Sequence, residues 1–228
     1  PVKKRFFVTG TDTDAGKTFV TVLMLEALKQ KGLSTLALKP LAAGCEQVDG
    51  ELRNDDALKL QAAMTVALPY QQINPIALKS AIAPHLAAEE EGRTLSVDRL
   101  AGLIRGALMT PADVTLVEGA GGWLVPLNHR ETLGNLVKEL ELPVILVVGV
   151  RLGCLNHALL TAQAVAAAGL PLAGWVANGI DPEAAKVQEN INTLKSMLPA
   201  PCLGVIPHGP QADKEALAQL IDIDLLLQ

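Results

Sequence analysis

The sequence predicts an α/β fold in which a mostly parallel β-sheet is flanked by helices on both faces, as one domain over residues 1–228. Segments with the composition of strands alternate with segments of helical periodicity, and this alternation is typical of parallel sheets. Several of the strand segments are continuous apolar runs, as expected for strands that are buried on both faces. A chain of 228 residues that is 50% hydrophobic can also bury one large core.

Six segments have the composition of strands, and seven have the periodicity of helices. The predicted strands are residues 5–9, 35–38, 114–117, 144–148, 172–177 and 203–205. The predicted helices are residues 17–31, 55–65, 96–108, 132–140, 155–168, 182–197 and 212–219. The first helix has a clear end, because Lys29 and Lys31 lie in its last turn and Gly32 follows. Residues 71–93 show only weak periodicity, so we expect an irregular excursion there.

The stretch between Arg151 and Asp181 contains no formally charged residue and is long enough for a membrane-spanning helix. Polar residues, glycines and a proline interrupt it, namely Asn156, His157, Thr161, Gln163, Gly169, Pro171 and Gly174. A helix that is capped by Gly169 and followed by a strand explains this stretch better. We therefore expect a buried helix–strand pair and no membrane contact.

Composition and charge exclude several classes of partner. The formal net charge is −5, so the chain has no basic surface for nucleic acid or anionic lipid. Only 3% of the residues are aromatic, which also argues against a nucleic-acid surface built on base stacking. Cys45, Cys154 and Cys202 are odd in number and widely spaced, which predicts no disulfide framework and a cytoplasmic location.

The strongest motif is residues 10–18, GTDTDAGKT, which match the phosphate-binding P-loop pattern G-x-x-x-x-G-K-T. Its glycines allow backbone N–H groups to wrap around a phosphate, and the positive end of the following helix points to the same place. We expect Lys17 to reach the β- and γ-phosphates and the Thr18 hydroxyl to bind Mg²⁺. An apolar strand before the motif and an amphipathic helix after it support this interpretation. The sequence therefore predicts a P-loop NTPase that binds a nucleoside triphosphate.

Charged residues follow two other predicted strands and begin one predicted helix. Glu118 follows the third strand and is the expected acidic partner of a Mg²⁺-nucleotide site. Lys39 follows the second strand, where it either holds an anionic substrate group or is a solvated surface lysine. Asp55 and Asp56 begin a helix, where they are either metal ligands or first-turn acids that complement the helix dipole.

Two further strand ends are candidates for binding the base. Asn178 closes the fifth predicted strand, at a place where an amide can bind the edge of a purine. Residues 178–181 have the N-x-x-D spacing of GTPases but lack their lysine, so we expect ATP rather than GTP. Pro207, His208 and Gly209 are a second candidate wall of this pocket, while a plain loop histidine is the commoner interpretation of His208.

Five strings of residues resemble those of dethiobiotin synthetase. They are residues 10–18 (GTDTDAGKT), 39–40 (KP), 53–56 (RNDD), 117–122 (VEGAGG) and 153–157 (GCLNH), and the resemblance extends from Arg5 to Pro207. It implies an ATP- and Mg²⁺-dependent ligase of biotin synthesis that converts 7,8-diaminopelargonate and CO₂ or bicarbonate to dethiobiotin, ADP and phosphate. It also implies a carbamate and then a carbamic–phosphoric mixed anhydride, which the second amine closes to the ureido ring.

The resemblance implies a role for each matching residue. The metal ligands that it implies are Thr18, Asp56 and Glu118. The catalytic residues that it implies are Lys17, Lys39 and Thr13, the last two facing the carbamate and the transferred phosphoryl group. The nucleotide-binding residues that it implies are Asp14, Ala15, Gly16, Lys17, Thr18, Phe19, Asp56, Glu118, Gly119, Ala120 and Gly121, with Asn178, Pro207, His208 and Gly209 at the adenine.

The family is a homodimer whose substrate lies at the subunit interface, so the resemblance implies the same arrangement here. Gly153, Cys154 and Asn156 of the partner subunit would receive the substrate carboxylate at a helix N-terminus. Ala43 stands where the family has a substrate-binding serine, and the missing hydroxyl would remove one hydrogen bond worth about 0.5–1.5 kcal/mol. Substrate affinity is the property that this departure would change.

Two other functions are compatible with the P-loop. A regulatory or partitioning ATPase of the same branch would carry an extra lysine in the loop, where this chain has Thr11. The ATP-binding half of an amidoligase would need a glutaminase domain with a nucleophilic cysteine, for which we expect no room in 228 residues. ATP turnover that depends on a diamine would favour the synthetase, and turnover stimulated by a protein or a membrane would favour the regulatory ATPase.

Overall fold

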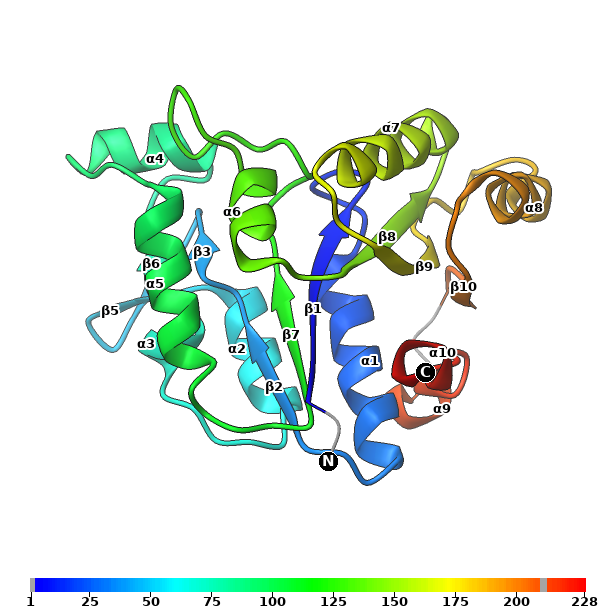
Figure 1. Ribbon diagram of the computed structural model, residues 1–228, viewed down its shortest axis with the longest axis horizontal. Coiled ribbons are helices and arrows are strands. Elements are labelled where there is room, and N and C mark those ends of the chain that lie inside the picture. The colour runs from blue at the N-terminus through cyan, green and yellow to red at the C-terminus, as the bar shows by residue number, and fades with distance from the viewer. Residues whose placement is uncertain (1–2, 210–212) are drawn as a thin grey trace.

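A six-stranded sheet forms the centre of the computed structural model, which describes residues 3–209 and 213–228 (Figure 1). The strand order is β10-β9-β8-β1-β7-β2, and every neighbouring pair is parallel. The six strands are β1 (Lys4–Gly10), β2 (Thr35–Leu38), β7 (Val114–Glu118), β8 (Val144–Val150), β9 (Leu172–Gly179) and β10 (Cys202–Ile206). The predicted fold class is confirmed, and each predicted strand lies in this sheet.

The chain order of the strands places helices on both faces of the sheet. From β1 to β2 the chain moves toward one edge, and from β7 through β8 and β9 to β10 it moves toward the other. Because such crossovers are right-handed, the helices of the two runs lie on opposite faces. One face carries α1 (Lys17–Gln30), α2 (Asp55–Ala63), α9 (Lys214–Ala218) and α10 (Asp224–Leu227), and the other carries α5 (Val97–Ala107), α6 (Leu133–Leu140), α7 (Cys154–Ala167) and α8 (Val187–Met197).

Aliphatic strand residues form the core. All seven residues of β8 and all four of β2 are buried. Burial of one Val, Leu or Ile side chain stabilises the fold by about 1.5–3 kcal/mol relative to exposure. Trp175 of β9 is fully buried in a cluster with residues of α7 and α8, and its indole N–H donates to the Ala200 carbonyl oxygen (3.1 Å). The buried strands therefore fix the positions of the residues that follow their ends.

Residues 71–93 contain short regular elements, so the prediction of an irregular excursion there is wrong. This part of the chain holds α3 (Tyr70–Ile73), β6 (Ile76–Ala77) and α4 (Pro84–Glu90). Before it lie β3 (Leu41–Ala42), which pairs in parallel with β6, and the antiparallel hairpin of β4 (Glu46–Val48) and β5 (Glu51–Arg53). Elements this short show no clear hydrophobic period, and they form here because separate segments of the chain pair with one another.

One predicted helix begins five residues later than expected, while the other six agree to within two residues at each end. The helix predicted over residues 182–197 starts at Val187, because Lys186 has a left-handed backbone conformation (φ 56°) that a right-handed helix cannot contain. The helix predicted over residues 212–219 starts at Lys214, and Ala212 lies outside the described residues. The Asp213 carboxylate caps it by accepting a hydrogen bond from the Glu215 N–H (3.1 Å).

The uncharged stretch between Arg151 and Asp181 forms α7 and β9, as predicted. In residues 3–209 and 213–228, no helix has the length and apolar character needed to cross a membrane. Cys45 and Cys154 are buried free thiols, and Cys202 is a free thiol that is partly buried.

Candidate nucleotide and metal site

The loop that joins β1 to α1 lies at the edge of the sheet where the parallel strands end. Gly16 has φ 87° and directly precedes α1, so the first N–H groups of the helix open onto the loop. A side chain at Gly16 would overlap the amide group of Asn178, which is a second reason for glycine at this position. Within the loop, the Asp14 N–H donates to the Asp12 carboxylate (3.1 Å). The loop therefore offers backbone donors and the positive end of a helix to an anion.

Neighbouring strands hold this loop in place. The Thr11 N–H donates to the Val147 carbonyl oxygen of β8 (3.0 Å), and the Thr11 hydroxyl accepts from the Gly149 N–H (3.2 Å). The Asn178 amide, near the end of β9, donates to the Ala15 carbonyl oxygen (3.0 Å). These contacts tie the loop to two strands of the sheet, so its shape is largely set before any ligand binds.

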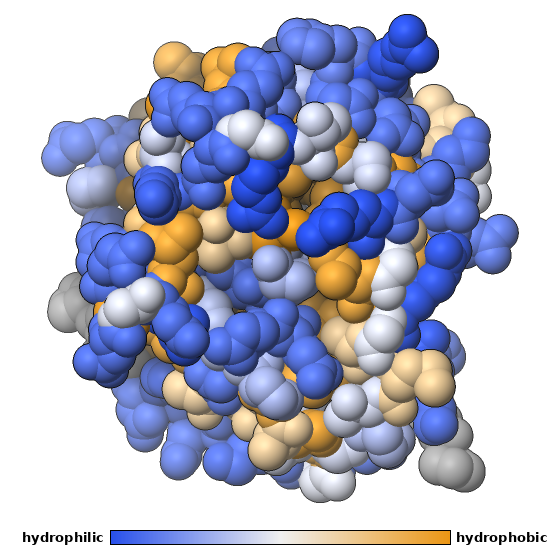
Figure 2. Space-filling view, turned by 90° about the vertical axis from the view of Figure 1, so that its left-hand side faces the viewer, coloured by the Kyte–Doolittle hydropathy of each residue, from blue (hydrophilic) through white to orange (hydrophobic). Residues whose placement is uncertain are grey.

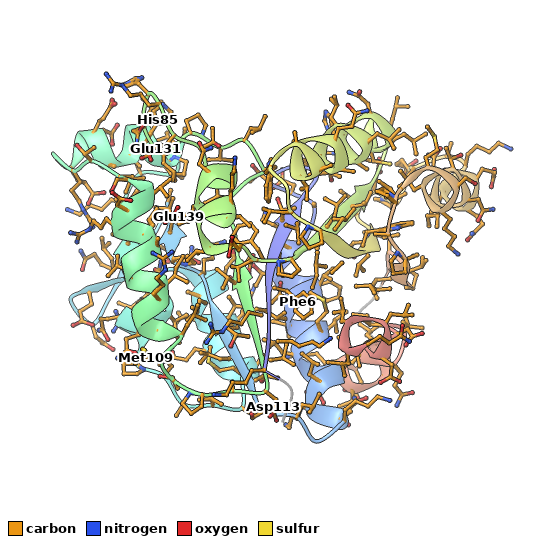
Figure 3. All side chains as sticks on the ribbon, in the orientation of Figure 1. Phe6, His85, Met109, Asp113, Glu131 and Glu139 are labelled. Atoms are coloured by element: carbon orange, nitrogen blue, oxygen red, sulfur yellow. The ribbon has the colours of Figure 1, made fainter. Side chains whose placement is uncertain are left out.

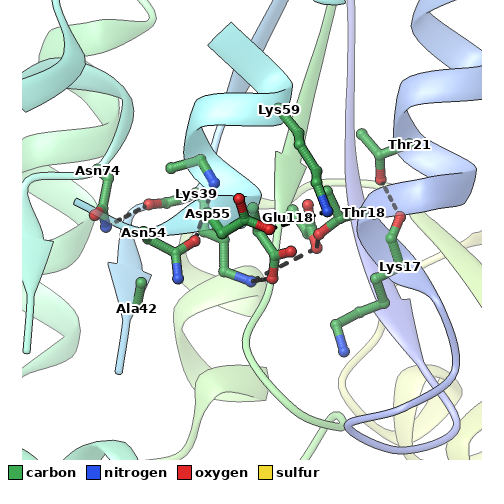
Figure 4. A network of polar contacts seen from close by, with 12 residues as sticks. Lys17, Thr18, Thr21, Lys39, Ala42, Asn54, Asp55, Lys59, Asn74 and Glu118 are labelled. Atoms are coloured by element: carbon green, nitrogen blue, oxygen red, sulfur yellow. Dashed lines mark hydrogen bonds and ion pairs between the residues drawn. The ribbon is translucent and has the colours of Figure 1, made fainter. Parts of the chain in front are cut away.

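Four polar side chains from different parts of the fold meet beside the loop (Figure 4). They are Thr18 in the first turn of α1, Lys39 after β2, Asp56 in α2 and Glu118 at the end of β7. The Thr18 hydroxyl donates to Glu118 Oε1 (2.6 Å). The Lys39 ammonium lies 3.0 Å from Asp56 Oδ2 and 3.7 Å from Glu118 Oε1. The structure thus brings together four residues that the sequence analysis singled out separately.

Burial and mutual charge shift the pKa values in this cluster. Burial raises the pKa of Glu118, and the Lys39 ammonium opposes that rise without cancelling it. Burial alone would lower the pKa of Lys39, but the Glu118 and Asp56 carboxylates outweigh it and raise the pKa of this lysine. Burial would likewise raise the pKa of Asp56, but the charge and hydrogen bond of Lys39 hold that pKa below its usual value. One buried ammonium therefore contacts two carboxylates and can offset the charge of only one of them.

Lys17 is buried at the first position of α1, where its ammonium lies 3.5 Å from the Asp12 carbonyl oxygen. Burial lowers the pKa of Lys17, and the nearby charge of Lys39 lowers it further. An anion bound between the loop and the cluster would counter both effects, because it would pair with the Lys17 charge in place of water. The phosphate oxygens of a nucleotide are anions of this kind.

The cluster fits a hard divalent cation. Thr18, Asp56 and Glu118 offer only oxygen atoms, which Mg²⁺ prefers. Glu118 Oε2 is buried and accepts no hydrogen bond from the residues that the structure describes, so one carboxylate oxygen is available to an ion. Three or more His, Cys, Asp or Glu side chains do not group into a metal cage anywhere in the described chain. Mg²⁺ needs no such cage, because one or two carboxylates, water and phosphate oxygens complete its shell.

A cavity of about 1310 Å³ extends from the loop past this cluster. The predicted site residues that line it are Thr13, Asp14, Gly16, Lys17, Thr18, Phe19, Lys39, Ala43, Asp56, Glu118, Ala120 and Gly121. Its far wall is largely apolar and includes Ala42, Ile82 and Val125. Figure 2 shows the side of the molecule that carries α4, where apolar residues gather near the centre of a mostly hydrophilic surface. The cavity therefore has both charged and apolar lining residues.

The other predicted site residues do not line this cavity. Ala15 and Gly119 are buried behind its wall. Asn178 contacts the loop, and the Pro207–Gly209 turn follows β10 beside the end of β9, where the His208 nitrogen closely approaches Gly179. Gly153, Cys154 and Asn156 form the start of α7, away from the cavity wall.

Three polar side chains that support the site were missed by the sequence analysis. Arg151, just after β8, forms an ion pair with Asp12 of the loop. Tyr70 and Asn74 connect the backbone of Lys39 to the start of α2 through hydrogen bonds. Tyr70 is the one tyrosine of the chain, but a single tyrosine in a weakly periodic segment gives no sign of this contact.

A phosphate-binding loop between the first strand and first helix of a parallel sheet, with an acidic residue at the end of the neighbouring strand, defines a P-loop protein that binds a nucleoside triphosphate. The family model described as an AAA domain matches residues 4–216. The protein named ATP-dependent dethiobiotin synthetase BioD of Cellvibrio japonicus (strain Ueda107) is 57% identical over 225 residues, which are 99% of this chain and 98% of that protein. The chain belongs to the ATP-dependent dethiobiotin synthetase family.

Other comparisons agree with this assignment. A relative of the same name from Pseudomonas aeruginosa (strain UCBPP-PA14) is 55% identical over 96% of both chains. The septum site-determining protein MinD of Pyrococcus horikoshii OT3, solved with Mg-ADP, has a TM-score of 0.57 at 19% identity and covers 99% of this chain and 89% of its own. The receptor FtsY of Elizabethkingia anophelis with GDP has a TM-score of 0.54 at 14% identity over 99% of this chain, which spans 64% of FtsY. The solved structures show the shared P-loop fold, and the relatives confirm the prediction of an ATP-dependent enzyme of this family.

Proposed function

We propose that this protein closes a ureido ring: it joins CO₂ to 7,8-diaminopelargonate at the expense of ATP, with Mg²⁺, and releases dethiobiotin, ADP and phosphate. Membership of the dethiobiotin synthetase family supports this reaction. The main structural observation in support of this site is that Lys39 is buried between Asp56 and Glu118 beside the P-loop. A buried ammonium between a phosphate site and an open cavity suits a reaction in which a carbamate attacks a phosphoryl group.

The nucleotide occupies the loop and the neighbouring strand ends. In this proposal Asp14, Ala15, Gly16, Lys17, Thr18 and Phe19 bind the phosphates, together with Glu118, Gly119, Ala120 and Gly121. Asn178 and the turn of Pro207, His208 and Gly209 bind the adenine. These adenine ligands end β9 and β10, which are adjacent strands on the β8 side of β1. Their position follows the rule that ligands of open α/β sheets bind beyond the carboxyl ends of the strands.

Each chemical step has a partner in this chain. One amine of the substrate adds CO₂, and the resulting carbamate pairs with the Lys39 ammonium beside Thr13. A carbamate oxygen attacks the γ-phosphorus and ADP leaves, while Lys17 and the loop N–H groups bind the charge on the phosphoryl oxygens. The second amine attacks the carbonyl carbon, phosphate leaves and the ring closes. Because the amine and the anhydride belong to one molecule, this closure has a high effective molarity.

Thr18, Asp56 and Glu118 would hold the Mg²⁺ ion. The ion would supply positive charge to the β- and γ-phosphate oxygens. Its three protein ligands come from three elements packed on the buried sheet, so they are in place before it binds. Lys39 contacts both carboxylates but offsets only one negative charge, so a divalent cation would supply the positive charge that the cluster lacks.

The proposal includes a homodimer, with Gly153, Cys154 and Asn156 of the partner subunit at the substrate carboxylate. Leu152, just before α7, is 99% exposed, and Leu160 within α7 is 55% exposed. Exposed leucines beside a helix N-terminus support an interface at this end of α7. The proposal places the enzyme in the cytoplasm, where the three free thiols would stay reduced.

A product assay tests this proposal. Purified protein is mixed with 7,8-diaminopelargonate, ¹³C-labelled bicarbonate and MgATP, and the products are analysed by mass spectrometry. We expect labelled dethiobiotin and ADP in equal amounts, and neither product when the diamine is left out. ATP hydrolysis without labelled ureide, or hydrolysis that needs a protein or membrane in place of the diamine, would contradict the proposal.

A further inference from the structure

Two buried side chains outside the cavity wall, Tyr70 and Asn74, connect the backbone at Lys39 to the helix that carries Asp56. The Asn74 amide donates to the Lys39 carbonyl oxygen (2.9 Å), and the Asn74 side-chain oxygen accepts from the Tyr70 hydroxyl (2.9 Å). The Tyr70 oxygen in turn accepts from the Asn54 N–H (2.6 Å). Figure 4 shows Asn74 pointing at the backbone of Lys39 from the side away from the P-loop.

Asn54 carries the connection into α2. Its side-chain oxygen accepts from the Ala57 N–H (2.9 Å) and so caps the helix. Asp56 lies in the first turn of α2, and its carboxylate is 3.0 Å from the Lys39 ammonium. The contacts therefore form a closed ring, which we call the Tyr70 ring: Lys39, Asn74, Tyr70, Asn54, Asp56 and back to Lys39.

The two buried members of the Tyr70 ring use their polar atoms fully. Tyr70 is 6% exposed and Asn74 is 3% exposed. The Asn74 amide also donates to the Ile76 carbonyl oxygen (3.2 Å), so both of its hydrogens have an acceptor. Burial raises the pKa of Tyr70, which keeps the hydroxyl protonated and able to donate. The Arg53 guanidinium covers the tyrosine ring at 4.3 Å from its centroid.

We propose that Tyr70 and Asn74 are positioning residues of the active site, which set the separation of the Lys39 ammonium and the Asp56 carboxylate. Neither residue lines the cavity, so neither would touch the substrate. Lys39 and Asp56 lie on separate segments, and the ring joins those segments close to the site, beside a backbone hydrogen bond from the Lys39 N–H to the Ile73 carbonyl oxygen (2.9 Å). The inference rests on the proposed function for the reaction, but the position of Asp56 as a metal ligand is measurable without that reaction.

Tyr70→Phe is the main test, because it removes one oxygen atom and keeps the buried ring. It leaves the Asn54 N–H and the Asn74 side-chain oxygen without their partner, so the start of α2 is free to shift relative to Lys39. We expect kcat to fall about 10-fold or more, the usual effect of losing an outer-shell partner of a metal site. We expect KM for MgATP to rise by a similar factor, because the ion that Asp56 would hold contributes to the affinity for ATP while the P-loop itself is untouched.

A second readout does not depend on turnover. Isothermal titration gives the affinity for ATP with Mg²⁺ and with EDTA, and the ratio of the two is the gain due to the metal. We expect Tyr70→Phe to reduce this gain about 10-fold and to leave the affinity in EDTA unchanged. If the wild type forms no dethiobiotin but the variant shows this loss, the positioning role stands and the proposed reaction falls.

Thr65→Val is the matched control. Thr65 and Thr35 exchange hydrogen bonds (2.8 and 3.0 Å) that tie the far end of α2 to the start of β2, away from the site. This variant removes a link between the same two elements, so we expect it to lower the melting temperature without changing kcat or the metal-dependent gain. Equal losses of kcat in Tyr70→Phe and Thr65→Val would show a general effect of stability and would overturn the inference.

A double-mutant cycle shows whether the two residues act together. Since Tyr70 and Asn74 belong to one ring, Tyr70→Phe combined with Asn74→Leu should lower kcat little more than the worse single variant. The pair of Tyr70→Phe and Thr65→Val should show independent effects. A kcat unchanged by Tyr70→Phe, or losses that multiply in the first pair, would contradict the Tyr70 ring.

Discussion

At the scale of single residues, the Lys39 ammonium offsets part of the negative charge of the site. Its side chain is buried, and its ammonium contacts the carboxylates of Asp56 and Glu118. An unpaired buried carboxylate is costly, so this lysine stabilises the cluster. In the proposed reaction, Mg²⁺ would take over the two carboxylates and the Lys39 charge would become available to the carbamate. The same side chain would then stabilise the fold before the ion binds and pair with the carbamate during the reaction.

Lys39→Ala should therefore separate binding from turnover. We expect kcat to fall about 10²–10³-fold, because the charge of the carbamate and the transferred phosphoryl group loses its buried partner. The Kd for MgATP should change only a few-fold, since Lys17 and the loop remain. Steady-state kinetics and isothermal titration measure the two effects. Lys31→Ala, which breaks an exposed ion pair with Asp224, is the control and should change neither value.

Glu118→Gln tests the metal site. The amide oxygen can still accept from the Thr18 hydroxyl, but the negative charge is gone. We expect ATP to bind equally well with Mg²⁺ and with EDTA, because one charged ligand of the ion is lost. Burial disfavours the charged form of Glu118, so the free energy of unfolding in urea should not fall. A variant that still binds ATP more tightly with Mg²⁺, to the same degree as wild type, would rule out Glu118 as a ligand.

At the scale of secondary-structure elements, strand ends position the site residues. Hydrogen bonds at the start of β7 help to fix one such strand. Figure 3 shows Asp113 at the end of the sheet opposite the P-loop. The Ser34 N–H donates to the Asp113 carboxylate (2.8 Å), and the Asp113 N–H donates to the Ser34 hydroxyl (2.9 Å). The pair joins the starts of β2 and β7, whose register pairs Thr35 with Val114. Lys39 and Glu118 lie just beyond β2 and at the end of β7.

Asp113→Asn should change the pH dependence of stability. The hydrogen bonds from Ser34 lower the pKa of Asp113 in the folded protein. Its contribution to stability is therefore fully present above the unfolded-state pKa, about 3.9, and is lost as pH falls through the lower folded pKa. We expect the Asn variant to be less stable than wild type at neutral pH, with the difference disappearing in acid. Urea unfolding from pH 7 to pH 2.5 measures it, and a constant difference would contradict the assignment.

The sequence predicts a feature well when the residues that form it are close together in the chain, and poorly when they are far apart. The P-loop is readable because its glycines, lysine and threonine lie within nine consecutive residues. Lys39 and Glu118 follow apolar strands, so their shared edge could be predicted, but the contact of Lys39 with Asp56 could not. The Tyr70 ring is invisible in the sequence because α3 and β6 have four and two residues and form only by packing. Lys186 shows the same limit, since its left-handed conformation depends on its surroundings.

At the scale of the whole molecule, a single substitution tests the proposed homodimer. Leu152→Glu places a charge on the fully exposed residue before α7, so we expect it to shift the protein from dimer to monomer. ATP affinity should be kept, while KM for the diamine should rise about 10-fold or more as the partner's contribution is lost. Sedimentation velocity and kinetics measure this.

The control for that variant lies at the other end of the molecule. Met109 is 83% exposed, and Figure 3 shows it far from α7. Met109→Glu should leave both the dimer and KM unchanged. A Leu152→Glu protein that is still dimeric and has wild-type KM would contradict the proposed interface.

The transfer of an oxygen atom tests the central claim most directly. Bicarbonate labelled with ¹⁸O is supplied in unlabelled water with MgATP and the diamine, and the reaction is stopped before bicarbonate exchanges its label with water. The released phosphate is then examined by ³¹P NMR. If a carbamate oxygen attacks the γ-phosphorus beside Lys39, each phosphate released with a ring should carry one oxygen from bicarbonate. Phosphate with no ¹⁸O, at the same yield of dethiobiotin, would mean that the carbamate is not phosphorylated and would contradict the account.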